Sequence, residues 1–114
     1  MVSGPRSDLD HMTTPDISIL LAVRDGAGLI AGALESIQAQ DGVAWELILV
    51  DDGSRDTTAD VITGYIEAEP EFAARTTFVR QSPAGLAASL NRAACHARAP
   101  ILARLDADDR MLPG

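Results

Sequence analysis

The chain has 114 residues, of which 46% are hydrophobic and 23% are charged, and this composition is typical of a single globular domain. Its formal net charge of −8 argues against nucleic acid or an anionic membrane surface as the main partner, because both favour clustered basic residues. No apolar run approaches the roughly 20 residues that span a bilayer, and no secretory signal pattern opens the chain. We therefore expect a cytoplasmic protein without a transmembrane segment.

Residues 1–14 mix Gly, Pro, Ser, Arg, Asp and His without periodicity, so they are expected to be a flexible leader. The pair His11-Met12 resembles a cloning junction, which makes the leader a candidate expression scar and Met12 a candidate natural start. We take residues 15–114 as the folded part. The single cysteine, Cys95, excludes an internal disulfide, and its alanine neighbours predict that it is packed.

Apolar runs and amphipathic segments alternate along residues 15–114. Continuous apolar or β-branched runs predict strands at residues 17–23, 45–50, 76–80 and 100–105, and apolar residues at helical spacing predict helices at 29–40, after Ser54 or Asp56, and at 86–97. Pro70 is expected just beyond the second helix. Short links between strands and helices are typical of right-handed βαβ crossovers. The sequence therefore predicts an α/β fold, a Rossmann-like and mainly parallel sheet with helices on both faces.

A polar cluster follows each predicted strand: Arg24-Asp25, Asp51-Asp52, residues 81–85 and the run Asp106-Ala107-Asp108-Asp109. Parallel sheets bind ligands at the carboxyl ends of their strands, so we expect these clusters to share one edge. In an extended segment Asp106 and Asp108 point the same way. Two carboxylates with an open coordination sphere suit Mg²⁺ or Mn²⁺ shared with substrate phosphates. The alternative for the acidic run is a solvated turn.

Four segments, in this order and spacing, resemble the nucleotide-sugar-dependent glycosyltransferases of the GT-A fold, particularly the inverting family 2. The segments are residues 17–23, 46–58, 85–93 and 101–113, and the resemblance covers almost all of residues 16–114. It implies an enzyme that transfers a sugar from a nucleoside diphosphate sugar to an acceptor that the sequence does not identify. Residues 15–114 would be the N-terminal, donor-binding part of the GT-A domain.

The resemblance also implies roles for single residues. Asp52 would contact the nucleotide base, Val23 and Asp25 would frame it, and Asp106 would lie near the ribose. Asp108 would coordinate the Mg²⁺ or Mn²⁺ that holds the diphosphate. The sequence departs from the family in two loops: Ala22-Val23-Arg24-Asp25 replaces the usual Pro-x-Tyr-Asn, and Gly85 alone remains of an Asn-x-Gly before the third helix.

Family members carry the general base and the acceptor site in a second half, so we nominate no catalytic base in this sequence. We expect a donor-binding half that transfers little sugar alone. A half-sheet exposes an edge strand and an apolar face, and homodimerisation through that surface is a hypothesis.

Two other functions are considered. A receiver-type phosphoacceptor domain has a similar length and an acidic pair, but it relies on a lysine, and this chain has none. A non-catalytic nucleotide-binding module would keep the fold and lose the reaction. Among single residues, Trp45 is expected to pack at a strand start, and Arg104 to pair with Asp106 or Asp51.

Overall fold

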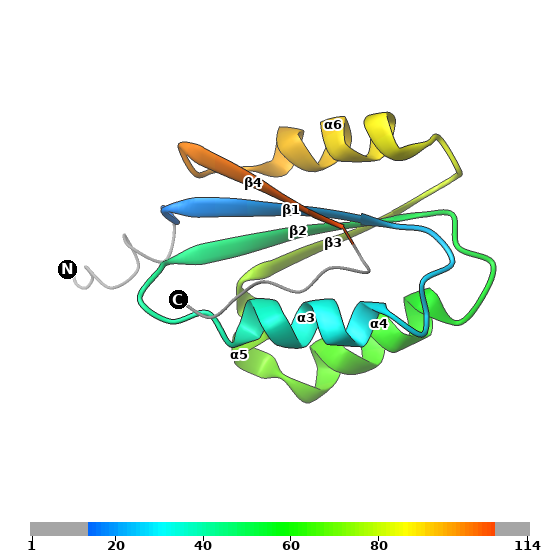
Figure 1. The fold of residues 1–114 in the computed structure, drawn as a ribbon, viewed down its shortest axis with the longest axis horizontal. Helices are drawn as coiled ribbons and strands as arrows, with labels where there is room; N and C mark the ends of the chain where they lie inside the picture. The colour runs from blue at the N-terminus through cyan, green and yellow to red at the C-terminus, as the bar shows by residue number, and fades with distance from the viewer. Residues whose placement is uncertain (1–13, 107–114) are drawn as a thin grey trace.

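The computed structural model describes residues 14–106, which form three layers with a parallel sheet in the middle (Figure 1). The strands are β1 (Ile17–Val23), β2 (Trp45–Asp52), β3 (Thr76–Gln81) and β4 (Ile101–Asp106). The helices are α3 (Ile30–Gln38), α4 (Thr58–Ala68), α5 (Pro70–Ala74) and α6 (Leu86–His96). Helices α3, α4 and α5 cover one face of the sheet and α6 covers the other (Figure 1). The predicted Rossmann-like sheet with helices on both faces is confirmed.

The strand order is β3-β2-β1-β4, and all three neighbouring pairs are parallel. The chain first builds outward from β1 through β2 to β3, and then crosses back to place β4 on the other side of β1. This is the order of the Rossmann fold, whereas receiver domains have the order 2-1-3-4-5. The receiver-type alternative is therefore excluded. The switch in direction lies between β1 and β4, where such sheets bind ligands.

Two apolar cores form because successive residues of a strand face opposite sides of the sheet. All eight residues of β2 are buried, as expected for a central parallel strand. Burying each large aliphatic side chain contributes about 1.5–3 kcal/mol. The larger core lies under the three helices, and its buried strand residues are Ile19, Leu21, Val23, Trp45, Leu47 and Leu49. The smaller core, under α6, contains Leu20, Ile48, Val50 and Ala93.

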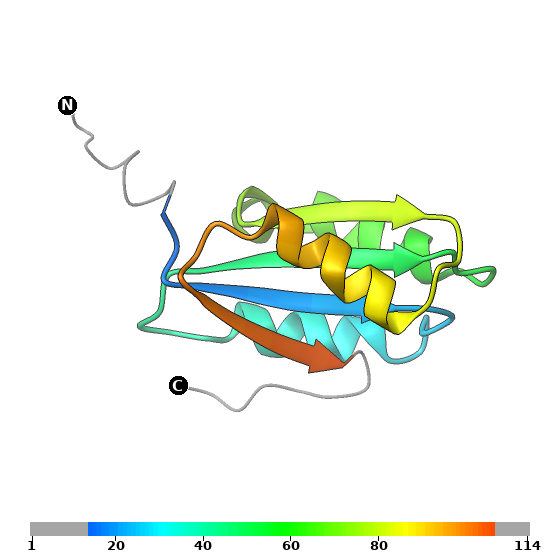
Figure 2. The same ribbon diagram turned by 90° about the horizontal axis from the view of Figure 1, so that it is seen from above.

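Helix α6 lies across β1 and β2 (Figure 2) and buries only Ser89 and Ala93 of its own residues. Cys95 is exposed, so the expectation that it is packed was wrong. The physical reason is that α6 contacts the sheet through one face, which carries Leu90, Ala93 and Ala94, and Cys95 lies off that face.

Three further residues, Trp45, Pro70 and Asp56, lie at the ends of elements. Trp45 is buried beside Phe72, with a centroid separation of 5.8 Å, as predicted. Pro70 lies just beyond the end of α4 at Ala68, as predicted, and it also begins the short helix α5, where a missing N–H costs nothing. Asp56 supplies the cap-like contact of α4, because its Oδ1 accepts a hydrogen bond from Thr58 N at 2.9 Å.

The structure contains a buried carboxylate that the sequence did not single out. Glu46 on β2 is 4% exposed and accepts hydrogen bonds from Ser18 Oγ (2.6 Å), Arg98 N (2.7 Å) and Arg98 Nε (3.1 Å). Burial acts to raise the pKa of Glu46, but these donors together lower it. Ser18 Oγ also accepts a hydrogen bond from Ala99 N. Glu46 thus fixes the connection from α6 to β4 at the amino end of the sheet.

Candidate nucleotide-binding site

The loops after β1, β2 and β3 meet at the carboxyl edge of the sheet, and Asp52 lies where two of them join. Asp52 is the last residue of β2 and is 4% exposed. Its Oδ1 accepts hydrogen bonds from Gln81 Nε2 (2.9 Å) and Ala84 N (2.8 Å), and its Oδ2 accepts one from Gly85 N (2.9 Å). The carboxylate therefore ties the β3–α6 loop to the end of β2.

These contacts set the charge state of Asp52. The hydrogen bond from Gln81 and the two backbone N–H groups lower the pKa of Asp52, outweighing the opposing effect of burial. Gln81 Nε2 also lies 3.0 Å from Ser89 Oγ, and Arg92 donates to Gln81 Oε1 at 3.3 Å. Asp52 is thus an ionised acceptor at neutral pH, and its network reaches the first turns of α6.

Asp25 joins the loop after β1 to the loop after β2. It adopts a left-handed backbone conformation (φ 52°), which aspartate tolerates better than most residues. Its Oδ1 accepts hydrogen bonds from Arg55 N (2.7 Å) and Asp56 N (3.4 Å), and its own N–H donates to Ser54 Oγ at 2.8 Å. Asp56 and Thr58 bond back to residues 26 and 27. Asp25 therefore holds the neighbouring loop in place.

Asp51 and Asp52 are adjacent in the sequence but face opposite sides of the sheet. Asp51 is fully buried on the side of the three helices, where Oδ1 accepts a hydrogen bond from Ser54 N at 3.1 Å. Oδ2 lies 3.5 Å from Arg80 Nε, a charge contact beyond good hydrogen-bond geometry. Asp51 therefore holds the loop after β2 through its hydrogen bond with Ser54, on the side of the sheet that carries the three helices.

A pocket of about 250 Å³ opens between the end of β1 and the start of α6. It is smaller than the roughly 300–1,000 Å³ of sites for whole drug-sized ligands, so it fits a part of a larger ligand. Val23 lines it but also belongs to the larger core. The full lining is Ala22, Val23, Arg24, Asp52, Gly85, Leu86 and Ser89. Three of the expected site segments, those after β1, β2 and β3, meet here.

Asp106 ends β4 and lies beside this pocket, because it is the register partner of Ala22 on β1. Its side chain is 50% exposed, and its Oδ1 pairs with Arg104 at 3.3 Å, as expected for Arg104. Within residues 14–106, no group of three potential metal-ligating side chains comes together. Asp108 lies outside the described residues.

Several contributors to the site were not predicted from the sequence. Gln81 and Ser89 complete the network around Asp52, yet no local pattern marks a glutamine or serine as a partner of a distant acid. Gly53 (φ 73°) lies so close to Pro83 that a Cβ built there would be 2.5 Å from Pro83 Cδ. An Asp-Gly-Ser run does suggest a tight turn, but the approach of the β3–α6 loop is a tertiary contact.

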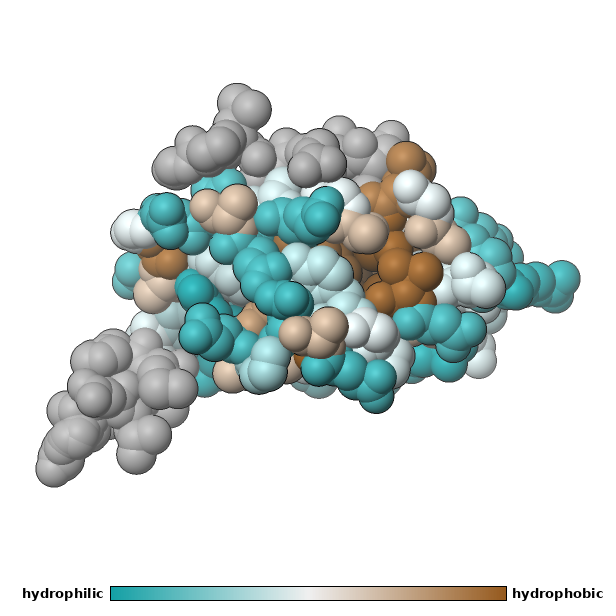
Figure 3. Space-filling view, turned by 90° about the horizontal axis from the view of Figure 1, so that it is seen from below, coloured by the Kyte–Doolittle hydropathy of each residue, from teal (hydrophilic) through white to brown (hydrophobic). Residues whose placement is uncertain are grey.

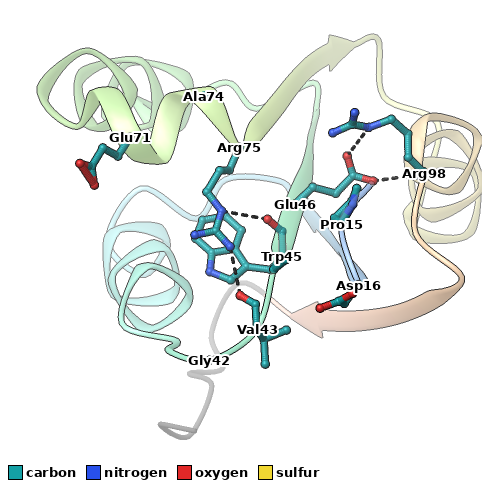
Figure 4. Close-up of a pocket in the computed structure, with 11 residues that line it drawn as sticks. Pro15, Asp16, Gly42, Val43, Trp45, Glu46, Glu71, Ala74, Arg75 and Arg98 are labelled. Carbon is teal, nitrogen blue, oxygen red and sulfur yellow. Dashed lines mark hydrogen bonds and ion pairs between the residues drawn. The ribbon is translucent and has the colours of Figure 1, made fainter. Parts of the chain in front are cut away.

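A larger pocket, of about 680 Å³, lies at the opposite, amino end of the sheet (Figure 4). Its two arginines already have partners. Arg98 contacts Glu46, and Arg75 lies 3.8 Å above the Trp45 ring while donating to the carbonyls of Trp45 and Val43 (Figure 4). These groups hold neighbouring segments together, and we do not assign the pocket a ligand.

Comparison with known proteins agrees with this arrangement. The family model described as glycosyl transferase family 2 matches residues 18–114. The succinoglycan biosynthesis protein ExoU of Rhizobium meliloti (strain 1021) is 34% identical over 100 residues, which cover 87% of this chain and 28% of ExoU. The chain spans about a third of the length of the curated relatives that it matches.

Solved structures show the same fold. A mannosyltransferase, PcManGT from Pyrobaculum calidifontis in complex with GDP-Man and Mn²⁺, superposes with a TM-score of 0.77 at 30% identity, covering 83% of this chain and 28% of PcManGT. S. aureus TarS 1-349 in complex with UDP-GlcNAc gives 0.73 at 21% identity, covering 83% of this chain and 27% of that one. The family match extends over most of the sequence, and on that evidence the chain belongs to glycosyltransferase family 2.

Proposed function

We propose that this chain binds the nucleoside diphosphate sugar donor of a glycosyl transfer at the carboxyl edge of its sheet. In this proposal the base lies against Asp52, Val23 and Asp25 frame it, and the ribose lies near Asp106. One observation carries the proposal: the pocket lined by Asp52 adjoins Asp106 at the switch in direction between β1 and β4. Such a switch point is the general ligand site of open α/β sheets.

The neighbouring structures support this ligand class. PcManGT was solved with GDP-Man and Mn²⁺, and TarS with UDP-GlcNAc. Because the chain spans about a third of its relatives, the inverting transfer itself is proposed for the whole protein. The acceptor and the catalytic base are left unassigned.

The donor atoms available near β4 suit a hard divalent cation. Asp106 is half-exposed and touches one cation, Arg104, through a single oxygen, so its carboxylate can take a further ligand. We propose that Asp108 is the metal ligand, with Mg²⁺ and Mn²⁺ both compatible with carboxylate oxygen. A bound divalent cation would stabilise the charge that develops on the leaving diphosphate.

The chain's own residues fix the site before the donor arrives. Asp52 holds the β3–α6 loop through two backbone N–H groups, and Asp25 holds the β2–α4 loop in the same way. Loops that are already ordered lose less entropy on binding, which favours affinity. The contacts of Asp25 and Asp52 therefore have a positioning effect that does not require direct contact with the sugar.

The first test is calorimetry of the 114-residue chain with GDP, UDP and dTDP, each in Mn²⁺ and in chelator. We expect Mn²⁺-dependent binding of at least one nucleotide. In Asp108→Ala this binding should weaken by roughly tenfold or more, because losing even a residue that only hydrogen-bonds to a metal ligand lowers metal affinity by about that factor. Asp41→Ala, an exposed acid before β2, is the matched control and should bind normally. Equal binding in chelator would overturn the metal assignment, and no binding of any nucleotide would overturn the donor site.

Within residues 14–106 no strand lies beyond β4, and this edge supports a second proposal, homodimerisation through that surface. Ile101 and Leu102 are 59% and 51% exposed, although both lie in a strand. On the face that carries α3 and α4, apolar side chains gather in the half towards β4 (Figure 3). None of the helices within residues 14–106 is long and apolar enough to cross a membrane.

A further inference from the structure

We infer that Arg24 selects the base of the donor, and that the base it selects is guanine. The inference rests on the proposed donor site and names the nucleotide class for it. The geometry places Arg24 in the wall of the small pocket, directly after β1, with Asp52 in the same wall. A cation and an acid together line a pocket that is too small for a whole sugar nucleotide.

Arg24 differs from most of the other arginines in the part of the chain that the structure describes. Arg75, Arg80, Arg92, Arg98 and Arg104 each contact a defined partner: the Trp45 ring, Asp51, Gln81, Glu46 and Asp106, respectively. Arg24 is exposed, and within residues 14–106 its guanidinium has no hydrogen bond or ion pair. Its five N–H donors are therefore available to a ligand in the pocket.

Asp52 offers the complementary group. Its Oδ1 already accepts two hydrogen bonds, but from the described residues 14–106 its Oδ2 accepts only the one from Gly85 N. A carboxylate oxygen can accept two, so Oδ2 retains one acceptor position. Its lowered pKa keeps this oxygen ionised at neutral pH. The wall of the pocket thus carries one free hydrogen-bond acceptor, from Asp52, and the N–H donors of the Arg24 guanidinium.

These two groups distinguish the bases of GDP, UDP and dTDP. The free acceptor on Asp52 takes an N–H donor, and guanine, uracil and thymine each carry a ring N–H that can supply it. The guanidinium of Arg24 binds two acceptors side by side, and guanine offers O6 and N7 in that arrangement. Uracil and thymine present isolated carbonyl oxygens, so Arg24 would make a single bond to them. Of these three bases, guanine is therefore the one that satisfies both residues.

The protein test compares two exposed arginines at the same edge of the sheet. Arg55, in the β2–α4 loop, is also exposed and does not line the pocket. By calorimetry with Mn²⁺, the 114-residue chain should bind GDP more tightly than UDP or dTDP by roughly tenfold. In Arg24→Ala this preference should disappear because GDP binding weakens to the level of UDP, whereas Arg55→Ala should keep it. Melting temperatures of both variants should match the parent chain.

The ligand test uses 7-deaza-GDP, which lacks the N7 acceptor. It should bind the parent chain several-fold more weakly than GDP, and Arg24→Ala should bind the two ligands equally, because the contact is then already lost. Equal weakening of GDP, UDP and dTDP in Arg24→Ala would overturn the inference by indicating a phosphate contact. So would tighter binding of UDP or dTDP than of GDP, and both results leave the donor site intact. Failure of every nucleotide to bind would overturn the donor site and this inference together.

Discussion

At the scale of residues, one carboxylate holds most of the candidate site together. Asp52 joins the end of β2 to the β3–α6 loop through three hydrogen bonds. We predict that Asp52→Asn lowers the free energy of unfolding by about 1.5–3 kcal/mol, because an amide N–H₂ would replace one oxygen and face either Gly85 N–H or another donor. Urea unfolding at pH 7 measures this change in unfolding free energy. The control is Asp41→Asn at an exposed position, whose unfolding free energy should lie within about 0.5 kcal/mol of that of the parent.

The same residue gives a pH dependence with a defined sign. The pKa of Asp52 in the folded protein is lowered, below the value of about 3.9 expected in the unfolded chain. Its stabilising effect is therefore complete above that unfolded value and is lost as pH falls through the folded pKa. The difference in unfolding free energy between the parent chain and Asp52→Asn should be constant from pH 7 to 5 and shrink below pH 4. If the difference in unfolding free energy between the two proteins grew as the pH fell, the lowered pKa of Asp52 would be contradicted.

At the scale of elements, the site depends on how closely two loops approach. A Cβ on Gly53 would lie 2.5 Å from Pro83 Cδ and Cγ, and Gly53 has a positive φ of 73°. Gly42 has a similar φ of 77° but open space around it. Gly42→Ala should cost about 1 kcal/mol for the backbone alone, and Gly53→Ala should cost more, by about 1–3 kcal/mol, for overpacking. If urea unfolding gave the same loss of unfolding free energy for both variants, the Pro83 side chain would be able to move away from the new Cβ at no cost.

The strands and the ligand edge were predictable because their signals are local. Continuous apolar runs marked β1 and β2, and the acids that follow them marked the carboxyl edge. The partners of those acids were not predictable. Gln81 and Ser89 reach Asp52 from elements 29 and 37 residues away in the sequence, and only the register of β2 with β3 and the position of α6 bring them together. Glu46 and Arg98 meet for the same reason.

The burial of a single small residue on a helix was also misjudged. The alanines next to Cys95 suggested that this cysteine is packed, but the helix presents one face to the sheet, and that face buries Ala93 and leaves Cys95 exposed. In α3, larger side chains at helical spacing made the buried face clear, and Ile30, Leu34 and Ile37 are all fully buried.

At the scale of the whole molecule, the two edges of the sheet differ in chemistry. Of the described strands, β3 and β4 each have one neighbour. The β3 edge carries threonines, Arg80 and Gln81, as edge strands that avoid pairing usually do. The β4 edge begins instead with the exposed Ile101 and Leu102. An apolar edge whose backbone groups face no further strand in the described part of the chain can pair with another copy of itself, which is the basis for the homodimer proposal.

This difference allows a matched test of the homodimer. Sedimentation velocity over a wide concentration range should show self-association of the parent chain. Leu102→Lys should weaken it by roughly tenfold or more, because burying one large apolar side chain is worth about 1.5–3 kcal/mol and a symmetric dimer buries it twice. Thr77→Lys places the same charge on the exposed β3 edge and should leave association unchanged. A parent chain that stays monomeric at the highest concentration would overturn the proposal, and equal weakening by both variants would assign the effect to net charge rather than to β4.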